Sequence, residues 1–122
     1  MKKIFVFLFV FMLSSCVNTY QNNLNKLLED ATEESYGKAP KDGYQVYAER
    51  GIKATLKDPD SAKFKWGKLY HCDFHSRDSF TTPILGWCTE VSYNAKNSFG
   101  GYVGYQTIEL RFLNGELYSM GL

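Results

Sequence analysis

The densest group of side chains able to do chemistry is the segment 71–75, which reads His-Cys-Asp-Phe-His. Alternate residues of a strand face the same side, so His71, Asp73 and His75 would share one face. Imidazole and carboxylate groups are ligands that zinc accepts in proteins. However, no second cluster of such ligands occurs in the sequence, and two surface histidines are the simpler interpretation. We therefore expect no metal here, and no other cofactor.

Two cysteines could supply a nucleophile or a disulfide. The sequence has three cysteines, Cys16, Cys72 and Cys88, and the first belongs to an N-terminal motif described below. A nucleophilic cysteine would need a free thiolate beside a base, which His71 or His75 could provide for Cys72. Export would instead place the two remaining thiols in an oxidising compartment, where they allow one intramolecular pairing. We expect a Cys72–Cys88 disulfide and no catalytic cysteine.

Glu90 is a candidate for acid–base chemistry, with Asp60 or Glu109 as its partner. Hydrolysis of this kind needs two carboxylates on either side of a cleft. Nothing in the sequence indicates a cleft, so the expected role is a solvated strand face. We assign no catalytic residue.

The segment 97–105, Asn-Ser-Phe-Gly-Gly-Tyr-Val-Gly-Tyr, combines glycines with large rings. It lacks the Gly-Lys-Ser/Thr ending of a phosphate loop and the spacing of a dinucleotide fingerprint. Aromatic side chains on a glycine-rich loop suit contact with a protein or a glycan. The alternative is a hairpin connection whose rings join the core. The residues of the candidate binding surface are Asn97, Phe99, Gly100, Gly101 and Tyr105.

Two helices are expected to precede the strands. Residues 17–23 are polar and read as a tether, and leucines at helical spacing predict a short helix over 25–34. An apolar stripe from Tyr44 to Leu56 predicts a second helix, which Asp58-Pro59 ends because the residue before a proline is pushed out of the helical region.

From residue 63 the hydrophobic period becomes two, which predicts strands. The expected strands are 63–74, 84–93, 102–113 and 116–120, with a polar loop over 75–82. Asn114-Gly115 is a two-residue hairpin signal that places Leu117 opposite Phe112. The fold class is therefore α+β, with one or two N-terminal helices packed on a three- to four-stranded antiparallel meander sheet.

Strand alternation also assigns faces. Tyr102 is in phase with Ile108, so it is expected to be buried, whereas Tyr105 and Phe99 are expected to be exposed. Cys88 is out of phase with the apolar face of its strand. Either a bulge shifts the register, or the disulfide lies on the sheet face away from the helix.

The N-terminus has the features of an export signal. Lys2 and Lys3 precede an apolar run of ten residues, 4–13, which is far shorter than the roughly 20 residues that span a bilayer. Leu13-Ser14-Ser15-Cys16 resembles the lipobox of bacterial lipoproteins. That resemblance implies cleavage before Cys16 and acylation of this cysteine, so that the protein is held on a membrane. Because residue 17 is not Asp, it also implies the outer membrane, facing the periplasm, in a Gram-negative host.

Three segments are therefore expected: a signal peptide over 1–15, a lipidated tether with a short helix and linker over 16–43, and an α+β domain over 44–122. Two of the 14 basic residues leave with the signal peptide, so 12 remain beside 13 acidic residues. A nucleic-acid-binding protein needs a clustered basic excess, so we expect no nucleic-acid partner.

Two segments, 56–64 and 87–105, resemble a family of small exported bacterial and prophage-encoded proteins. The shared patterns are DPDSAxF, CxEV and NAKNSFGGYxGY, and this chain departs from them by inserting Ser92 and Tyr93 before Asn94. The resemblance implies the fold and export but no activity. The order of helices and strands is also similar to the small outer-membrane lipoproteins that assist β-barrel assembly, which is an analogy of fold alone.

The expected function is a membrane-anchored envelope lipoprotein that acts as a non-enzymatic binding or scaffold module. Its partners would be membrane lipid, through acylated Cys16, and a protein of the cell envelope. One alternative is a prophage-encoded exclusion lipoprotein. Another is a small periplasmic hydrolase or metal-binding protein that uses His71, His75 and Glu90.

Overall fold

The structure is a computed structural model that describes residues 18–121, so Cys16 and the expected signal peptide lie outside the described residues. A helix over 18–29 comes first, followed by η1 (Glu33–Tyr36), α2 (Tyr44–Lys53) and η2 (Pro59–Ser61). The strands are β1 (Lys63–Trp66), β2 (Tyr70–Ser76), β3 (Ser79–Asn94), β4 (Gln106–Leu113) and β5 (Glu116–Gly121). All pairings are antiparallel, which confirms the α+β class. No helix among the described residues is long and apolar enough to cross a membrane.

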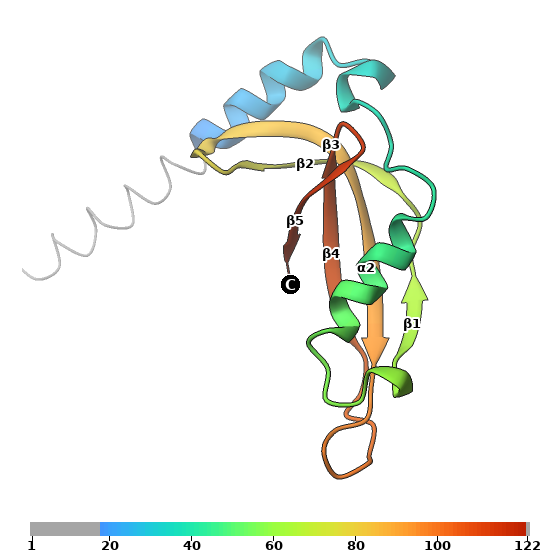
Figure 1. Cartoon of the computed structure of the whole chain (residues 1–122). Coiled ribbons are helices and arrows are strands. Elements are labelled where there is room, and N and C mark those ends of the chain that lie inside the picture. Colours follow the sequence, from blue (N-terminus) through green and yellow to red (C-terminus); the bar gives the residue numbers. More distant parts are fainter. Residues whose placement is uncertain (1–17, 122) are drawn as a thin grey trace, which may run out of the picture.

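β3 organises the sheet (Figure 1). β1 and β2 lie end to end along one of its edges, while β4 pairs with the other edge and β5 follows β4. The expected single strand 63–74 is therefore broken at 67–69. The Gly67 N–H still donates to the Glu90 carbonyl at 2.8 Å, so the edge stays paired through the break.

β2 and the first half of β3 form a hairpin arm, residues 70–86, that extends beyond the pairing of β3 with β4. The expectation of a polar loop over 75–82 is wrong, because these residues continue both strands around a tight turn at 77–78. Pro83 is tolerated inside a strand here because β3 has no second partner at this position. The sheet curls until Phe74 of the arm meets Tyr118 of β5, with their ring centroids 5.2 Å apart.

The core lies between α2 and the sheet. Its buried cluster is Ile52, Val91, Leu110 and Phe112. The ring of Tyr44 contacts those of Trp66 and Phe112 edge-on, at 5.7 and 5.4 Å. α2 ends at Lys53, earlier than expected, because the Thr55 hydroxyl donates to the Ile52 carbonyl at 2.8 Å and the chain turns away. The predicted apolar faces of β3 and β4 are confirmed by this cluster.

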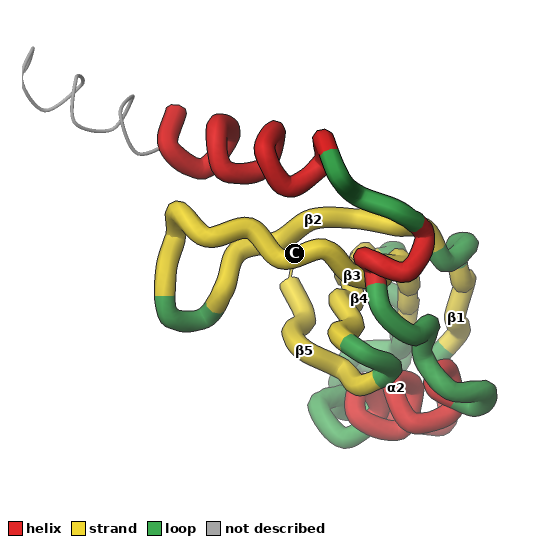
Figure 2. Tube along the Cα trace, turned by 90° about the horizontal axis from the view of Figure 1, so that it is seen from above, coloured by secondary structure: helices red, strands yellow, loops and turns green. Residues whose placement is uncertain are grey.

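The first helix starts earlier than the sequence predicts. Residues 18–23, expected to be part of a tether, are helical, and the helix lies along the arm (Figure 2). The Tyr20 hydroxyl donates to the Asp73 carboxylate at 2.8 Å, and the Asn23 amide donates to the Thr81 carbonyl at 2.8 Å. Leu24 is buried. These tertiary contacts override the weak helical signal of a polar segment.

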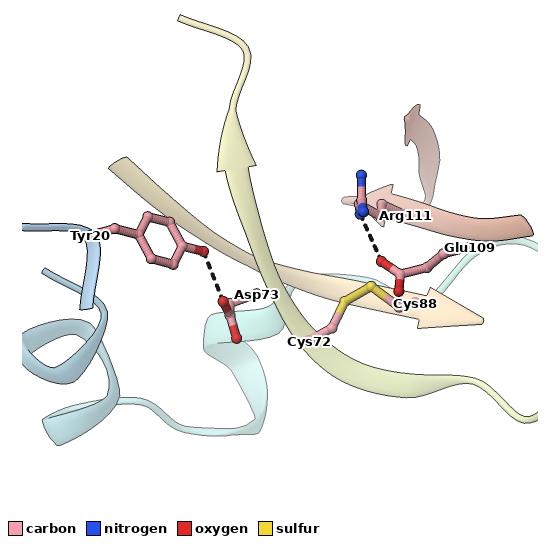
Figure 3. Close-up of a disulfide and its surroundings, with 6 residues drawn as sticks. All are labelled: Tyr20, Cys72, Asp73, Cys88, Glu109 and Arg111. Carbon is pink, nitrogen blue, oxygen red and sulfur yellow. Dashed lines mark hydrogen bonds and ion pairs between the residues drawn. A yellow bond between two sulfur atoms is a disulfide. The ribbon is translucent and has the colours of Figure 1, made fainter. Parts of the chain in front are cut away.

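The β4–β5 hairpin follows the sequence prediction. Asn114 and Gly115 have φ values of 51° and 86°, which the two-residue turn requires, and Phe112 pairs with Leu117. The Cys72–Cys88 disulfide is also confirmed, with Cα atoms 5.9 Å apart. Figure 3 shows the disulfide with Glu109 and Arg111 beside it. Cys88 lies opposite Arg111, whereas the core residue Val91 faces α2, so the disulfide is on the sheet face away from that helix.

Candidate binding surface

The side chains proposed for zinc lie on one face of β2, but each has another partner. The His71 ring stacks on Tyr36, with centroids 4.0 Å apart, and Asp73 accepts a hydrogen bond from Tyr20. His75 shares a 2.8 Å hydrogen bond with a carbonyl of the arm. Within residues 18–121, no three His, Cys, Asp or Glu side chains lie close enough to hold a metal ion.

The carboxylates proposed as a pair do meet. Glu90 and Glu109 are directly opposite each other on β3 and β4, whereas Asp60 lies apart from them in η2. Glu109 accepts a hydrogen bond from Arg111 at 2.7 Å (Figure 3), and Glu90 is exposed. Burial raises the pKa of nearby Tyr70 above its ordinary value, and the negative charges of the two glutamates raise it further. Glu109 is thus tied to a cation, while Glu90 faces solvent.

The loop between β3 and β4 is built around one asparagine. The Asn97 side-chain oxygen accepts hydrogen bonds from the N–H groups of Phe99 and Gly101, at 2.9 and 3.2 Å. The backbone N–H of Asn97 donates to the Gly101 carbonyl at 2.9 Å. Gly100 has a φ of +81°, a conformation that glycine adopts without strain. The apex is therefore a defined turn, and Asn97 shapes it rather than facing a ligand.

The base of the loop is tied to η2. The Lys96 N–H donates to the Ser61 hydroxyl at 2.8 Å, and the Tyr102 hydroxyl donates to the Ser61 carbonyl at 3.0 Å. The Gly104 N–H donates to the side chain of Asn94 at 3.1 Å. Apex and base together hold the loop in one conformation.

The aromatic side chains of this loop face solvent. Phe99 is 97% exposed, and Tyr105 and Tyr102 are 44% and 41% exposed. The expectation that Tyr102 is buried is wrong. Gly104, at a φ of +104°, breaks the extended backbone, so β4 begins only at Gln106 and its alternation does not reach back to Tyr102.

Three lysines lie over these rings. The Lys65 ammonium is 4.2 Å from the ring centroid of Tyr105, and those of Lys63 and Lys96 are 4.6 and 5.7 Å from that of Tyr102. We call this surface the tip, and its residues are Lys63, Lys65, Lys96, Phe99, Tyr102 and Tyr105. The sequence analysis missed the lysines. The signal for Lys63 and Lys65 was the outward half of the alternation in β1, but only the pairing of β1 with β3 brings them beside the loop, to which Lys96 itself belongs.

Two hollows lie elsewhere on the surface. One of about 460 Å³ runs between α2 and the β4–β5 hairpin, beside Tyr47, Leu117 and Met120. A second of about 260 Å³ lies between the end of α2 and the base of the loop, beside Leu56 and Val103. Neither is lined by Phe99, Tyr102 or Tyr105, although Lys96 of the tip lines the second, so the aromatic part of the tip lies outside both hollows.

No family model, curated protein or solved structure matches this chain. Function must therefore be inferred from the molecule's own surface. Among the described residues, the tip carries the most exposed large ring on a backbone that several hydrogen bonds hold in place.

Proposed function

We propose that the protein is a lipoprotein of the cell envelope, anchored through acylated Cys16, that binds a partner through the tip and carries out no catalysis. The observation that carries this proposal is the exposure of Phe99, at 97%, on a loop that hydrogen bonds hold in one conformation. A large ring left in water is unfavourable for the isolated protein and becomes favourable when a partner covers it.

The rigidity of the loop supports binding. A surface that is ordered before binding loses less conformational freedom when the complex forms. The Asn97 turn and the Ser61 contacts have already ordered the backbone. Aromatic residues on such a surface are the usual centres of binding energy in interfaces.

The position of the tip also supports the proposal. The helix over 18–29 and the tip lie at opposite ends of the molecule (Figure 1). An anchor at Cys16 would sit two residues before this helix, so the tip would point away from the anchoring membrane. In a Gram-negative host, we propose the periplasmic face of the outer membrane as the anchored side.

We further propose that the helices form one layer over a single face of the curled sheet. Tyr20 reaches Asp73 on the arm, and Tyr36 stacks on His71 of the same strand face. Ile52 belongs to the core cluster under α2. Such a layer would leave the loop between β3 and β4 uncovered.

The test is crosslinking in the native envelope. A photoreactive amino acid replaces Phe99 in the full-length protein, and a matched variant carries it at Phe80, which is also a phenylalanine and is 84% exposed on the arm. We expect a discrete crosslinked product from position 99 that is absent from position 80. Equal crosslinking from both positions, or no crosslink from position 99 to either protein or lipid, would refute the proposed binding surface.

A further inference from the structure

The apex of the tip projects into solvent. An added Cβ atom would meet no other atom within 4 Å at Gly100, Gly101 or Gly104, so nothing packs around this part of the loop. Val103 is 64% exposed beside Phe99. A projecting apolar ring can be buried either in a matching pocket of a protein partner or in a deformable surface such as a lipid bilayer.

The lysines of the tip carry unneutralised charge. Within residues 18–121, no carboxylate lies within ion-pair distance of Lys63, Lys65 or Lys96. Segments 53–66 and 94–106, which form this end of the molecule, hold five lysines against two acidic residues. At the opposite end, residues 18–36 hold one lysine against four acidic residues. The positive charge is therefore concentrated around the projecting ring.

We infer that the tip docks on an anionic phospholipid surface, with Phe99 entering the headgroup region and Lys63, Lys65 and Lys96 contacting lipid phosphates. This inference rests on the proposed function and names its partner. Tyrosine rings, such as the two of the tip, favour the membrane interface, and an apolar phenylalanine ring can be buried at the boundary between headgroups and acyl chains. Lysines near an anionic bilayer add attraction that falls off within a Debye length.

A bilayer fits the tip better than a protein pocket does. Lys63 and Lys65 lie on one face of β1, and the three ammonium groups lie over two different rings, those of Tyr105 and Tyr102. Such a row of separated charges matches a surface of many phosphates.

The test uses the mature chain, residues 16–122, with Cys16→Ser, so that binding does not depend on lipidation. This chain contains every described element. It is sedimented with vesicles of phosphatidylcholine alone or of phosphatidylcholine mixed with phosphatidylglycerol. We expect binding only to the anionic vesicles, with loss of binding at high salt.

Single substitutions test which residues contribute to vesicle binding. Phe99→Ala should weaken binding between about tenfold and about a hundredfold, as for loss of a buried aromatic ring. Each of Lys63→Gln, Lys65→Gln and Lys96→Gln should weaken it about fivefold. Phe80→Ala removes an equally exposed ring from the arm and should leave binding unchanged. All five positions are exposed or half-buried, and circular dichroism checks that each variant is folded.

Three results would overturn the inference: no binding of the folded chain to anionic vesicles, equal binding to neutral vesicles, or equal effects of Phe99→Ala and Phe80→Ala. A specific protein crosslink from position 99 together with no vesicle binding would keep the proposed binding surface and reject the lipid partner. Absence of both would reject the two together.

Discussion

Ser61 joins the two segments on which the family resemblance rests. Its hydroxyl donates to the Asp58 carbonyl at 2.7 Å and accepts from the Lys96 N–H at 2.8 Å, while its carbonyl accepts from the Tyr102 hydroxyl at 3.0 Å. The segments 56–64 and 87–105 are therefore in direct contact. Each supplies groups that the other needs, which gives a physical reason for finding them together in one chain.

Replacing Ser61 tests this connection. Ser61→Ala leaves the Lys96 N–H without its acceptor, which should destabilise the fold by about 1–3 kcal/mol. Hydrogen exchange should rise at the loop amides of Lys96, Phe99 and Gly101, because the base of the loop loosens. Ser98→Ala, at an exposed serine of the same loop, is the control and should change neither quantity. Unchanged amide hydrogen exchange in Ser61→Ala would show that the apex keeps its conformation without the contacts of Ser61.

Gly86 is the glycine that packing requires most strictly. A Cβ atom there would lie 2.4 Å from the Phe112 carbonyl oxygen and 2.9 Å from the Phe74 ring. Gly86→Ala should therefore cost about 1–3 kcal/mol or more, as overpacking does in a tight core. Gly101→Ala meets nothing within 4 Å and is the matched control. Urea unfolding of both variants measures the difference, and similar midpoints would contradict the close approach.

At the scale of elements, the disulfide fastens the arm where it leaves the rest of the sheet. Cys88 is fully buried and is one of the first β3 residues to pair with β4, while Cys72 belongs to the arm. The two cysteines are 16 residues apart, for which the chain-entropy model gives a stabilisation of about 3 kcal/mol.

Removing the disulfide should lower the free energy of unfolding by about 3 kcal/mol. The double variant Cys72→Ser/Cys88→Ser, measured by chemical denaturation, should match the wild-type domain in a reducing buffer. If the oxidised and reduced proteins unfold at the same denaturant concentration, the cross-link does not contribute to stability.

The docking of the first helix should depend on pH. Burial raises the pKa of the Tyr20 phenol above its ordinary value, and the hydrogen bond and charge of Asp73 raise it further. The unfolded chain loses this proton near pH about 10, while the folded protein keeps it. The contribution of Tyr20 is therefore fully present below pH about 10 and is lost as the pH rises above that value.

Tyr20→Phe removes this dependence. The stability difference between the wild type and Tyr20→Phe should be constant from neutral pH to pH about 9 and shrink above pH about 10. Tyr47→Phe, at an exposed tyrosine of α2, controls for general alkaline unfolding. A difference that stays constant to high pH would mean that Tyr20 titrates alike in both states.

The sequence predicted those elements whose causes are local. The Asn114-Gly115 turn sets its own register, so the pairing of Phe112 with Leu117 was predictable. The strand faces holding Val91 and Leu110 follow from alternation alone. The disulfide followed from counting cysteines, but its face depended on register, which the sequence left open.

The features that the sequence did not predict depend on distant parts of the chain. The first helix begins early because the arm supplies Asp73 and Thr81 as partners for its side chains. The arm itself is stable as a hairpin only because the helix and Tyr118 cover it. Within the tip, Phe99 was found from its loop, whereas Lys63 and Lys65 required the pairing of β1 with β3.

At the scale of the whole molecule, the end next to the proposed anchor and the end that carries the tip differ in charge. The acidic end, residues 18–36, follows the lipobox, and the basic end carries the tip. An anionic bilayer would repel the first and attract the second. An anchor before residue 18 would hold the acidic end at its own membrane, so the basic tip would be the end left to dock on a facing anionic bilayer.

Anchorage itself is tested by Cys16→Ser in the full-length protein. Without the cysteine there is no thiol to acylate, so the protein should appear in the soluble fraction or remain as an unprocessed precursor. Phe99→Ala is the control, because it alters the tip and should leave fractionation and processing unchanged. Wild-type processing and membrane retention in Cys16→Ser would refute the lipoprotein assignment.

The docked first helix also has a mechanical consequence. A pull on the chain at residue 18 loads the contacts at the start of the helix, including that of Tyr20, before those of Asn23 and Leu24, because these residues succeed one another along the helix. Contacts loaded in series break one at a time and at low force. The 12 residues of this helix span about 18 Å when coiled and about 40 Å when extended. If the chain is anchored before residue 18, unwinding of this helix under load would lengthen the connection between the anchor and the sheet before the disulfide-linked sheet bears any tension.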